Sequence, residues 1–385
     1  MAKRRANGEG NIRKRKDGRW EGRYTAGHDP ETGKPIYKNV LGKTQTEVKE
    51  KLKAAIGTAG QTDVLRANQY TLSKWLQFWL DNYGKMYLRP SSFTNYTGFL
   101  KNQISKNAVG NIMLQDLNAR DLQMFYNLMH TSGRVQRKES EKKPGGLAAK
   151  SIRNMHFFIS HALEQAVQEK LIPENPASGC TLPKREHPEM KTLPPDCLKD
   201  FLAEAKRSHI FELYCTELAT GLRRGELLGI KWSDINFATN SIYIQRQITR
   251  LNGVVQESPL KTKNAYRQII IPPDVAELLQ EKQKREQGFS EYVFPSPNGG
   301  PMCPDAMLKM LHRVLKRAGL PKIRFHDLRH TFATLALQSG VDVKTLSGLL
   351  GHSSAGFTLD TYAHVNLSMK QDAASKVGSF LAGAL

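Results

Sequence analysis

One stretch near the C-terminus carries cations, imidazoles and a phenol at regular spacings. It reads His326-Asp-Leu-Arg329-His330, then His352, and ten positions later Tyr362. Residues three and four apart share one face of an α-helix, so the side chains of His326, Arg329 and His330 point in one direction. Tyr362 is the last tyrosine of the chain. The spacing therefore predicts a cluster of basic groups to which a single phenol can be added.

A phenol surrounded by positive charge is suited to attack a phosphodiester. Its ordinary pKa of about 10 makes it a poor nucleophile at neutral pH, but nearby cations favour the phenolate. Guanidinium groups can also stabilise charge that develops on the non-bridging phosphate oxygens, each by roughly 3 kcal/mol by analogy with oxyanion donors. This chemistry predicts a second cationic site upstream. Arg223, in Thr-Gly-Leu-Arg-Arg-Gly-Glu, supplies it.

Taken together, these motifs resemble those of the tyrosine recombinases, specifically the integrases of temperate phages and conjugative transposons. In that family an arginine follows Thr-Gly-Leu, a lysine lies in a β-hairpin, His-x-x-Arg and Gly-His come later, and a tyrosine attacks DNA. The catalytic residues that this resemblance implies are Arg223, Lys261, His326, Arg329, His352 and Tyr362. It implies no cofactor and no metal. The spacing from His352 to Tyr362 departs from the family, where nine positions are more usual than ten.

The resemblance also implies a role for each residue. Tyr362 attacks the scissile phosphate, the two arginines hold its oxygens, and Lys261 protonates the 5′ leaving oxygen. His326 acts as proton acceptor or phosphate ligand, and His352 donates a further hydrogen bond to the phosphate. The phosphotyrosyl bond keeps the energy of the broken ester, so a 5′ hydroxyl can rejoin it without ATP or metal.

The lysine has two candidates. The runs Ser241–Thr249 and Arg267–Ile271 are rich in β-branched residues and predict strands, with Lys261 and Lys263 at the turn end of the second pair of strands. The family's Pro-Lys-Thr-Lys hairpin favours Lys261, although Leu260 separates this lysine from the proline here. Lys263 remains an alternative general acid, because either cation would lie on the same short hairpin.

The composition predicts a polyanionic partner. The chain has 385 residues, 39% of them hydrophobic, and a formal net charge of +21. This length allows two or three domains with cores, and the charge indicates nucleic acid. The four cysteines are far apart, which suggests neither a disulfide framework nor a zinc site. Since the sequence contains no apolar run long enough to span a bilayer, we expect a cytoplasmic protein without a membrane partner.

The N-terminal part predicts a small sheet followed by a helix. Turn residues at Asp17-Gly18 and Asp29–Gly33 separate three strand-like runs, and Thr44–Ile56 follows with helical periodicity. The expected class is multidomain, mainly α with small β-sheets. By resemblance, residues 1–57 form an arm-site DNA-binding domain, and residues 58–69 are small and polar, typical of a linker.

Helical periodicity dominates the middle of the chain. Four apolar stripes in residues 70–173 predict amphipathic helices, which resemble the family's core-binding (SAM-like) domain. Residues 174–195 are rich in proline and predict a second linker. From residue 196 to 385 we expect the α+β catalytic tyrosine recombinase domain with a C-terminal tail. There, Leu198–Ala219 predicts one helix, Asp342 is expected to cap Val343–Leu350, and Gly351 to end it.

The tail presents an apolar face at Val377, Phe380, Leu381 and Ala384. Something must cover this face. Either it folds onto its own domain or it docks into the next protomer, as tails do in related recombinases.

Three other functions compete with an integrase. His326 and His330 imitate half of a zinc site, but Asp327 replaces the required glutamate and Arg329 would lie beside the metal. A type IB topoisomerase shares the phosphotyrosine chemistry. A DNA-binding regulator would keep the fold without cutting, although no required group is missing. The function favoured by the resemblance is a site-specific recombinase that integrates and excises a mobile element. Its partners would be core and arm sites on double-stranded DNA, three further protomers in a tetramer, and an excisionase. The sequence does not distinguish a phage from a conjugative transposon.

Overall fold

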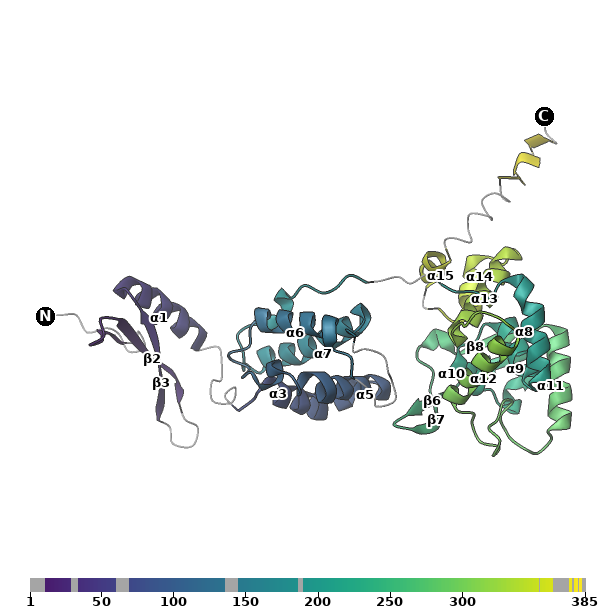
Figure 1. The fold of residues 1–385 in the computed structure, drawn as a ribbon, viewed down its shortest axis with the longest axis horizontal. Helices are drawn as coiled ribbons and strands as arrows, with labels where there is room; N and C mark the ends of the chain where they lie inside the picture. The colour runs from purple at the N-terminus through teal and green to yellow at the C-terminus, as the bar shows by residue number, and fades with distance from the viewer. Residues whose placement is uncertain are drawn as a thin grey trace. The chain divides into compact units, whose positions relative to one another are not determined.

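The chain is divided into two compact units, Met1–His187 and Pro188–Leu385, which are described separately. The computed structural model describes residues 11–28, 34–59, 69–135, 145–185, 190–352 and 354–362, and within the C-terminal segment residues 374–375, 377–379 and 381–382 (Figure 1). In these residues, no helix is both long and apolar enough to cross a membrane.

The first unit begins with the predicted three-stranded sheet. Its antiparallel strands are β1 (Asn11–Lys14), β2 (Trp20–His28) and β3 (Pro35–Gly42), and they are followed by helix α1 (Gln45–Ala59). The helix buries Val48 and Leu52 against a face of the sheet that carries glycine. A Cβ on Gly22 would lie 2.9 Å from Val48 Cγ1, so the absence of a side chain there allows the close contact. The predicted sheet and helix are confirmed.

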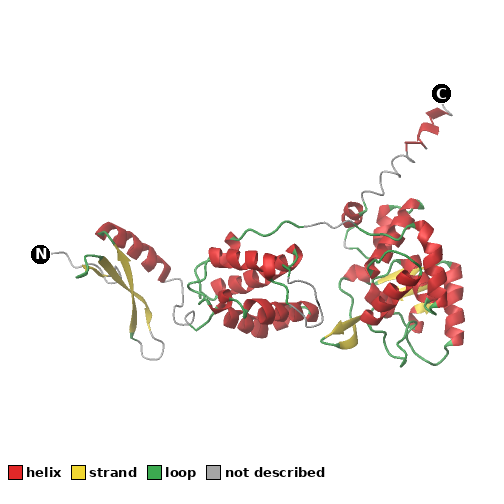
Figure 2. Ribbon diagram, in the orientation of Figure 1, coloured by secondary structure: helices red, strands yellow, loops and turns green. Residues whose placement is uncertain are grey.

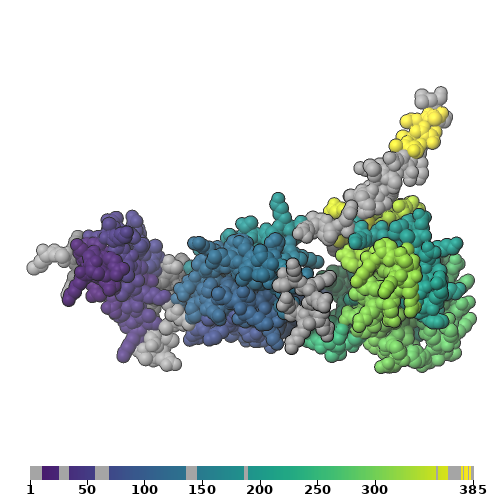
Figure 3. All heavy atoms as spheres, in the orientation of Figure 1, coloured from purple at the N-terminus to yellow at the C-terminus, as the bar shows by residue number. Residues whose placement is uncertain are grey.

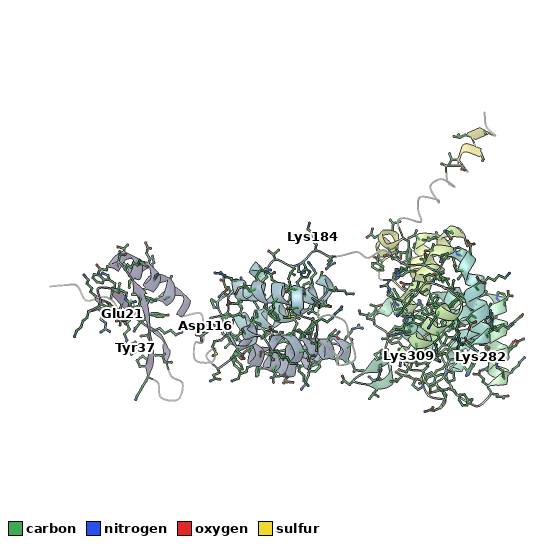
Figure 4. The ribbon with its side chains drawn as sticks, in the orientation of Figure 1. Glu21, Tyr37, Asp116, Lys184, Lys282 and Lys309 are labelled. Carbon is green, nitrogen blue, oxygen red and sulfur yellow. The ribbon has the colours of Figure 1, made fainter. Side chains whose placement is uncertain are left out.

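Hydrogen bonds and a cation–π contact hold polar side chains on this sheet. Glu21 is 4% exposed and accepts hydrogen bonds from Arg13 Nε and Asn39 Nδ2, both at 2.8 Å. The Arg23 guanidinium lies 4.1 Å from the centroid of the Tyr37 ring, a cation–π contact. Figure 4 labels Glu21 and Tyr37 on neighbouring strands. The arginines are therefore held on the sheet by specific partners.

Helices form the rest of the first unit (Figure 2). The four predicted apolar stripes lie in one core, and Trp75 Nε1 donates a buried hydrogen bond of 2.6 Å to Ala162 O. The helices and shorter helical segments are α3 (Leu72–Trp79), a π-helical segment (Leu80–Gly84), α4 (Lys85–Tyr87), α5 (Pro90–Phe99), a second π-helical segment (Leu100–Ile104), α6 (Ala119–Ser132), α7 (Ala149–Gln168), and 3₁₀ turns at Ala108–Asn111 and Pro176–Gly179.

The segment predicted as the second linker is packed in its first part. Ala177 is fully buried in the helical core, and Cys180 and Leu182 pack against it. Arg153 Nη1 donates to Pro183 O at 2.7 Å, which extends this contact along the chain. The described residues up to Pro183 therefore belong with the helices in packing. The assignment of residues 1–57 to arm sites and of residues 70–173 to core sites stays a prediction.

The second unit packs helices around a small sheet. Figure 3 draws the heavy atoms of this unit as spheres, coloured from teal through green to yellow along the chain. The strands β4, β5 and β8 form one antiparallel sheet, and β6 and β7 form a separate hairpin. The elements are α8 (Pro195–Arg207), α9 (Phe211–Thr220), α10 (Arg224–Leu228), β4 (Ile235–Asn236), β5 (Ser241–Ile244), β6 (Gln247–Leu251), β7 (Val254–Ser258), β8 (Arg267–Ile270), α11 (Pro273–Arg285), α12 (Pro304–Arg317), α13 (Phe325–Gln338), α14 (Val343–Leu350) and α15 (Ala355–Thr361), with 3₁₀ turns at Trp232–Asp234 and Lys263–Ala265.

Two sequence predictions for this unit need correction. The single helix expected at Leu198–Ala219 is broken into α8 and α9, because His209 adopts a left-handed conformation with φ of 56° and Ile210 N turns back to Ala205 O at 3.0 Å. The run Ser241–Thr249 is likewise divided between β5 and β6, which belong to different sheets. Neither break carries a proline or glycine, the residues that mark breaks most clearly.

Asp342 caps α14 as predicted. Its Oδ1 accepts from the backbone N–H of Lys344 at 3.0 Å and of Thr345 at 2.9 Å, and Gly351 ends the helix with φ of 62°. In the tail, Val377 is 58% and Leu381 is 52% exposed, so their own domain leaves these side chains uncovered. Phe380 and Ala384 lie outside the described side chains.

A pair of neighbouring glycines in the first unit gives a matched stability test. A Cβ at Gly146 would lie 1.4 Å from His130 O in α6, whereas one at Gly145 would meet no atom within 4 Å. We predict that Gly146→Ala lowers the free energy of unfolding by about 2 kcal/mol, because a helix carbonyl cannot move aside cheaply. Urea unfolding followed by circular dichroism measures this. Gly145→Ala serves as the control, and equal stabilities of the two variants would contradict the packing.

Candidate active site

The ends of two helices meet the guanidinium of Arg329. Helix α9 ends at Gly221, which has φ of 58°, and α14 ends at Gly351, so both helices leave carbonyls without helical partners. From α13, Arg329 Nη1 donates to Gly221 O at 2.8 Å and Nη2 donates to Leu350 O at 2.6 Å. The residue is 1% exposed. The helix ends therefore fix this guanidinium in place, and a cation suits the negative end of a helix dipole.

Arg223 is fixed in a related way. Its Nη2 donates to Gly351 O at 2.9 Å, and its Nη1 pairs with Glu226 Oε1 at 2.6 Å. The other oxygen of Glu226 binds Arg267 Nη2 at 3.0 Å, and Arg267 Nε donates to Leu349 O at 2.7 Å. One carboxylate thus joins two guanidiniums, and both reach the end of α14. The Arg223 side chain stays 38% exposed, which leaves it open to a ligand.

Sequence reasoning missed Glu226 and Arg267 as parts of the site. Burial alone would raise the pKa of Glu226, but Arg267 and Arg223 outweigh it and hold the pKa below its ordinary value. Burial and the charge of Arg223 lower the pKa of Arg329 to about 10, so this guanidinium stays charged at neutral pH. Glu226 lies three positions after Arg223, a helical spacing that could have signalled the pair. No spacing rule connects it to Arg267.

Gly221 is required by the contact between α9 and α13. A Cβ there would lie 2.2 Å from Phe332 Cδ1, and the positive φ disfavours other residues as well. Phe332 lies on α13, the helix that carries Arg329. The Thr-Gly-Leu-Arg motif therefore allows two helices to approach while it delivers Arg223 to the site.

The two predicted catalytic histidines are held neutral. Desolvation by neighbouring protein atoms, followed by the electrostatic effects of His330 and of the nearby arginines, lowers the pKa of His326 to about 4, although the residue as a whole is exposed. Burial and the charges of Arg329 and Arg223 lower the pKa of His352 to about 3. The hydroxyl of Thr358 lies 2.7 Å from His352 Nδ1. If that hydroxyl donates, His352 Nε2 carries the hydrogen and can donate to a phosphate.

Tyr362 lies buried at the end of α15. It is 2% exposed and packs with Ala333, Leu337, Leu346 and Leu350. Its Oη lies 2.7 Å from His330 Nδ1. Burial raises the pKa of Tyr362 to about 12, and the charge of Arg329 opposes this only in part. Arg329 therefore favours the phenolate as expected, but burial outweighs its effect and the phenol keeps its proton.

The lysine candidates lie beside the site but not in a hairpin turn. The β6–β7 hairpin turns at Asn252-Gly253, whereas Lys261 and Lys263 follow β7 and lead toward β8. Both lysines are exposed. This connection reaches the site through Asn264, whose Nδ2 donates to His352 O at 3.4 Å. Lys261 and Lys263 both lie close in sequence to Asn264, so the structure does not favour either one as the general acid.

A basic cleft of about 610 Å³ adjoins His326. The side chains that line it with charged or titratable groups are Lys191, Arg224, His312, Lys322, Arg324, His326 and Asp327. Among the described residues, no group of three or more His, Cys, Asp or Glu side chains is placed to hold a metal ion. The site can therefore hold an anion between two fixed guanidiniums, next to a cleft suited to a polyanion.

The phage integrase family model matches residues 191–369, and the model of the integrase N-terminal SAM-like domain matches residues 71–130. The chain belongs to the phage integrase family. It is 28% identical to a tyrosine recombinase XerC-like protein of Caldanaerobacter subterraneus subsp. tengcongensis, over 91% of this chain and 93% of that one. It is 25% identical to the ICEBs1 integrase of Bacillus subtilis, over 96% and 100%.

Solved structures of integrases share the fold. The Tn1549 transposon integrase in complex with transposon right end DNA gives a TM-score of 0.67 at 22% identity, covering 80% of this chain and 100% of that chain. A lambda integrase dimer bound to a COC′ core site gives a TM-score of 0.56 at 21% identity, covering 93% and 97%. The predicted fold class is confirmed.

A further carboxyl group, that of Glu217, interacts electrostatically with Arg329. Glu217 in α9 is fully buried, and within the described part of the chain neither of its side-chain oxygens has a hydrogen-bond partner. Burial raises its pKa well above the ordinary value, although Arg329 opposes this. The group is therefore held as a neutral acid at the pH where an exposed glutamate ordinarily titrates.

We predict that Glu217→Gln becomes more stable relative to the unaltered protein as pH rises. A carboxyl whose pKa is raised by folding stabilises the native state below its unfolded pKa, and this contribution is lost as pH increases toward the folded pKa. Glutamine does not titrate. Melting temperatures from pH 4 to 9 measure the difference. The contrasting control is Glu226→Gln, which removes an ionised partner of two arginines and should destabilise at neutral pH. If the difference in melting temperature between Glu217→Gln and the unaltered protein did not depend on pH, the assignment of Glu217 as a buried neutral acid would be contradicted.

Proposed function

We propose that this protein integrates and excises a mobile element by cleaving and rejoining DNA at specific sites, with Tyr362 as the nucleophile. The family assignment makes it a tyrosine site-specific recombinase. The observation that carries the residue assignment is the pair of guanidiniums, Arg223 and Arg329, which separate elements bring to the end of α14. A scissile phosphate is the anion that such a pair fits in a DNA-cleaving enzyme.

The arginines bind the phosphate in this mechanism. Each guanidinium has five N–H donors, and Arg329 uses two nitrogen atoms for Gly221 O and Leu350 O. Donors that remain can face the non-bridging oxygens, where charge increases in the transition state. His326 lines the basic cleft and serves as a phosphate ligand, and His352 donates from Nε2. Both histidines do this as neutral imidazoles.

Tyr362 forms the covalent bond and a lysine completes the step. The phenolic oxygen attacks phosphorus, the 5′ oxygen leaves, and Lys261 protonates it. Because the phosphotyrosyl ester keeps the energy of the broken bond, the 5′ hydroxyl of a partner strand can reverse the reaction without ATP or metal. In this structure the hydroxyl of Tyr362 is buried, so DNA binding must bring it to the phosphate.

The proposed partners follow from the same reaction. Exchange of strands between two duplexes needs paired core sites and four protomers, and the lambda integrase, which shares this fold, has been solved as a tetramer bound to a Holliday junction. Arm sites for the N-terminal sheet, an excisionase and a cytoplasmic location, where the DNA lies, complete the proposal. The exposed apolar side chains of Val377 and Leu381 support the proposal that the tail docks into a neighbouring protomer.

Two alternatives are not favoured. A type IB topoisomerase would relax supercoiled DNA without paired sites, and a regulator would bind without cleaving. Relatives named as integrases or tyrosine recombinases match nearly the whole chain. The arginines, histidines and tyrosine of the motif are all present.

The test of the nucleophile is a nicked suicide substrate that carries the core site from the DNA flanking the gene. We predict that the protein forms a covalent 3′-phosphotyrosine adduct, which digestion and mass spectrometry locate at Tyr362. Tyr362→Phe should bind the same DNA and form no adduct, because only the hydroxyl is lost. Tyr292→Phe is the matched control. An adduct in Tyr362→Phe, or one located at another residue, would refute the assignment.

A substrate with a different leaving group can show whether Lys261 or Lys263 is the general acid. A general acid is not needed when the 5′ oxygen is replaced by sulfur, because a thiolate leaves without a proton. We predict that Lys261→Ala cleaves the ordinary substrate about a hundredfold more slowly and is restored by the 5′-thio substrate. Lys263→Ala should cleave both at nearly the normal rate. The reverse pattern would assign the role to Lys263, and failure of sulfur to restore either variant would exclude both.

A further inference from the structure

The hydroxyl of Tyr362 meets a residue that the motif-based mechanism does not use. Within the described residues, its hydrogen-bonding partner is His330, with Oη 2.7 Å from Nδ1. The two rings lie at 62° with centroids 5.7 Å apart. His330 is 9% exposed and follows Arg329 directly in α13. The residue that touches the reacting oxygen is therefore neither His326 nor His352.

The direction of this hydrogen bond depends on the tautomer of His330. Burial lowers the pKa of His330, so its imidazole is neutral at physiological pH, while the phenol of Tyr362 keeps its proton. In the tautomer of the neutral imidazole whose ring hydrogen lies on Nε2, Nδ1 accepts and the phenol donates. The phenolic proton then points at a basic nitrogen, and this is the tautomer that proton transfer to Nδ1 requires.

We propose that His330 is the base that takes the proton of Tyr362 during DNA cleavage. This inference rests on the proposed role of Tyr362 as nucleophile. As the phenolic oxygen bonds to phosphorus, its O–H bond breaks and an N–H bond forms at His330 Nδ1. The bond from phosphorus to the 5′ oxygen breaks, and that oxygen receives a proton from the lysine. In the rejoining step His330 returns the proton to the departing phenol.

The charges around His330 suit this transfer. Asp327, one turn earlier in α13, is fully buried, carries a negative charge and favours the protonated imidazole. Arg324 and Arg329 oppose it, while His326 contributes a neutral ring with its centroid 4.7 Å away. From outside α13, Tyr362 contacts His330, and the neutral His352 lies within electrostatic range of it. A bound phosphate adds negative charge beside the arginines, so substrate makes protonation of His330 easier.

The position of His330 also suits access to DNA. His326 lines the basic cleft, and its ring touches that of His330. His330 and the Tyr362 hydroxyl are thus one helical turn from the basic cleft, the surface that we assign to DNA. A competing role is purely mechanical: the hydrogen bond would hold Tyr362 inside until DNA arrives. The two roles predict opposite results when the basic nitrogen is removed.

The test is single-turnover cleavage of the suicide substrate by His330→Asn. Asparagine can place a polar atom near the position of Nδ1 but is not a base, so we expect cleavage to slow about a hundredfold with DNA binding unchanged. The control is Thr334→Val, one turn further along α13, whose buried hydroxyl has no partner in the described part of the chain. It should cleave normally. Cleavage by His330→Asn at the normal rate or faster would overturn the base and favour the mechanical role.

A second measurement separates a missing base from a misplaced tyrosine. Replacing Tyr362 by 3,5-difluorotyrosine lowers the pKa of the phenol and reduces its need for a base. In the His330→Asn background this replacement should restore cleavage at least tenfold, and absence of rescue would overturn the proposal. His330→Gln replaces His330→Asn if the latter does not fold. The outcomes separate two failures: an unaltered protein that forms no adduct at Tyr362 refutes the nucleophile, whereas a normal adduct formed equally fast without His330 refutes only the base.

Discussion

The site depends on carbonyl groups that two helices leave unsatisfied at their ends. Gly221 and Gly351 end α9 and α14 in the left-handed conformation, and Gly221 O, Leu350 O and Gly351 O accept from arginine side chains. Buried carbonyls need donors, and guanidiniums provide them with charge. The same contacts that stabilise the helix ends therefore set the direction of Arg223 and Arg329. An anion-binding site of this kind is assembled before any DNA arrives.

Burial then decides how the other groups behave. Arg329 keeps its charge, His326 and His352 are neutral, and Tyr362 keeps its proton. Such a site carries enough positive charge to bind a phosphate. Its protonated and buried phenol is poorly suited to attack until the phosphate is bound. Tyr362 lies among apolar side chains at the end of the short helix α15, and its hydroxyl is satisfied by His330. Reaction with DNA therefore requires a rearrangement of Tyr362, the proposed nucleophile, while the guanidiniums can stay in place.

Much of this arrangement can be predicted from the sequence where local rules apply. Helical spacing places His326 and Arg329 on α13, and Asp342 marks the start of α14. The chain-wide order of motifs indicates the family. Local rules fail where the determining contact is distant. Glu226 and Arg267 meet across 41 positions, and the raised pKa of Tyr362 comes from packing that no spacing reveals. The break between α8 and α9 rests on His209, which adopts a left-handed conformation that glycine takes far more readily.

The most direct test of the account is a structure of the Tyr362→Phe variant bound to its own core-site duplex. We predict that Arg223 and Arg329 keep their contacts with Gly351 O, Gly221 O and Leu350 O. We also predict that both guanidiniums lie within about 3 Å of the non-bridging oxygens of one phosphate, with the substituted phenyl ring directed at its phosphorus. A scissile phosphate bound away from either guanidinium, or arginines that leave the helix ends to reach it, would contradict the preassembled site.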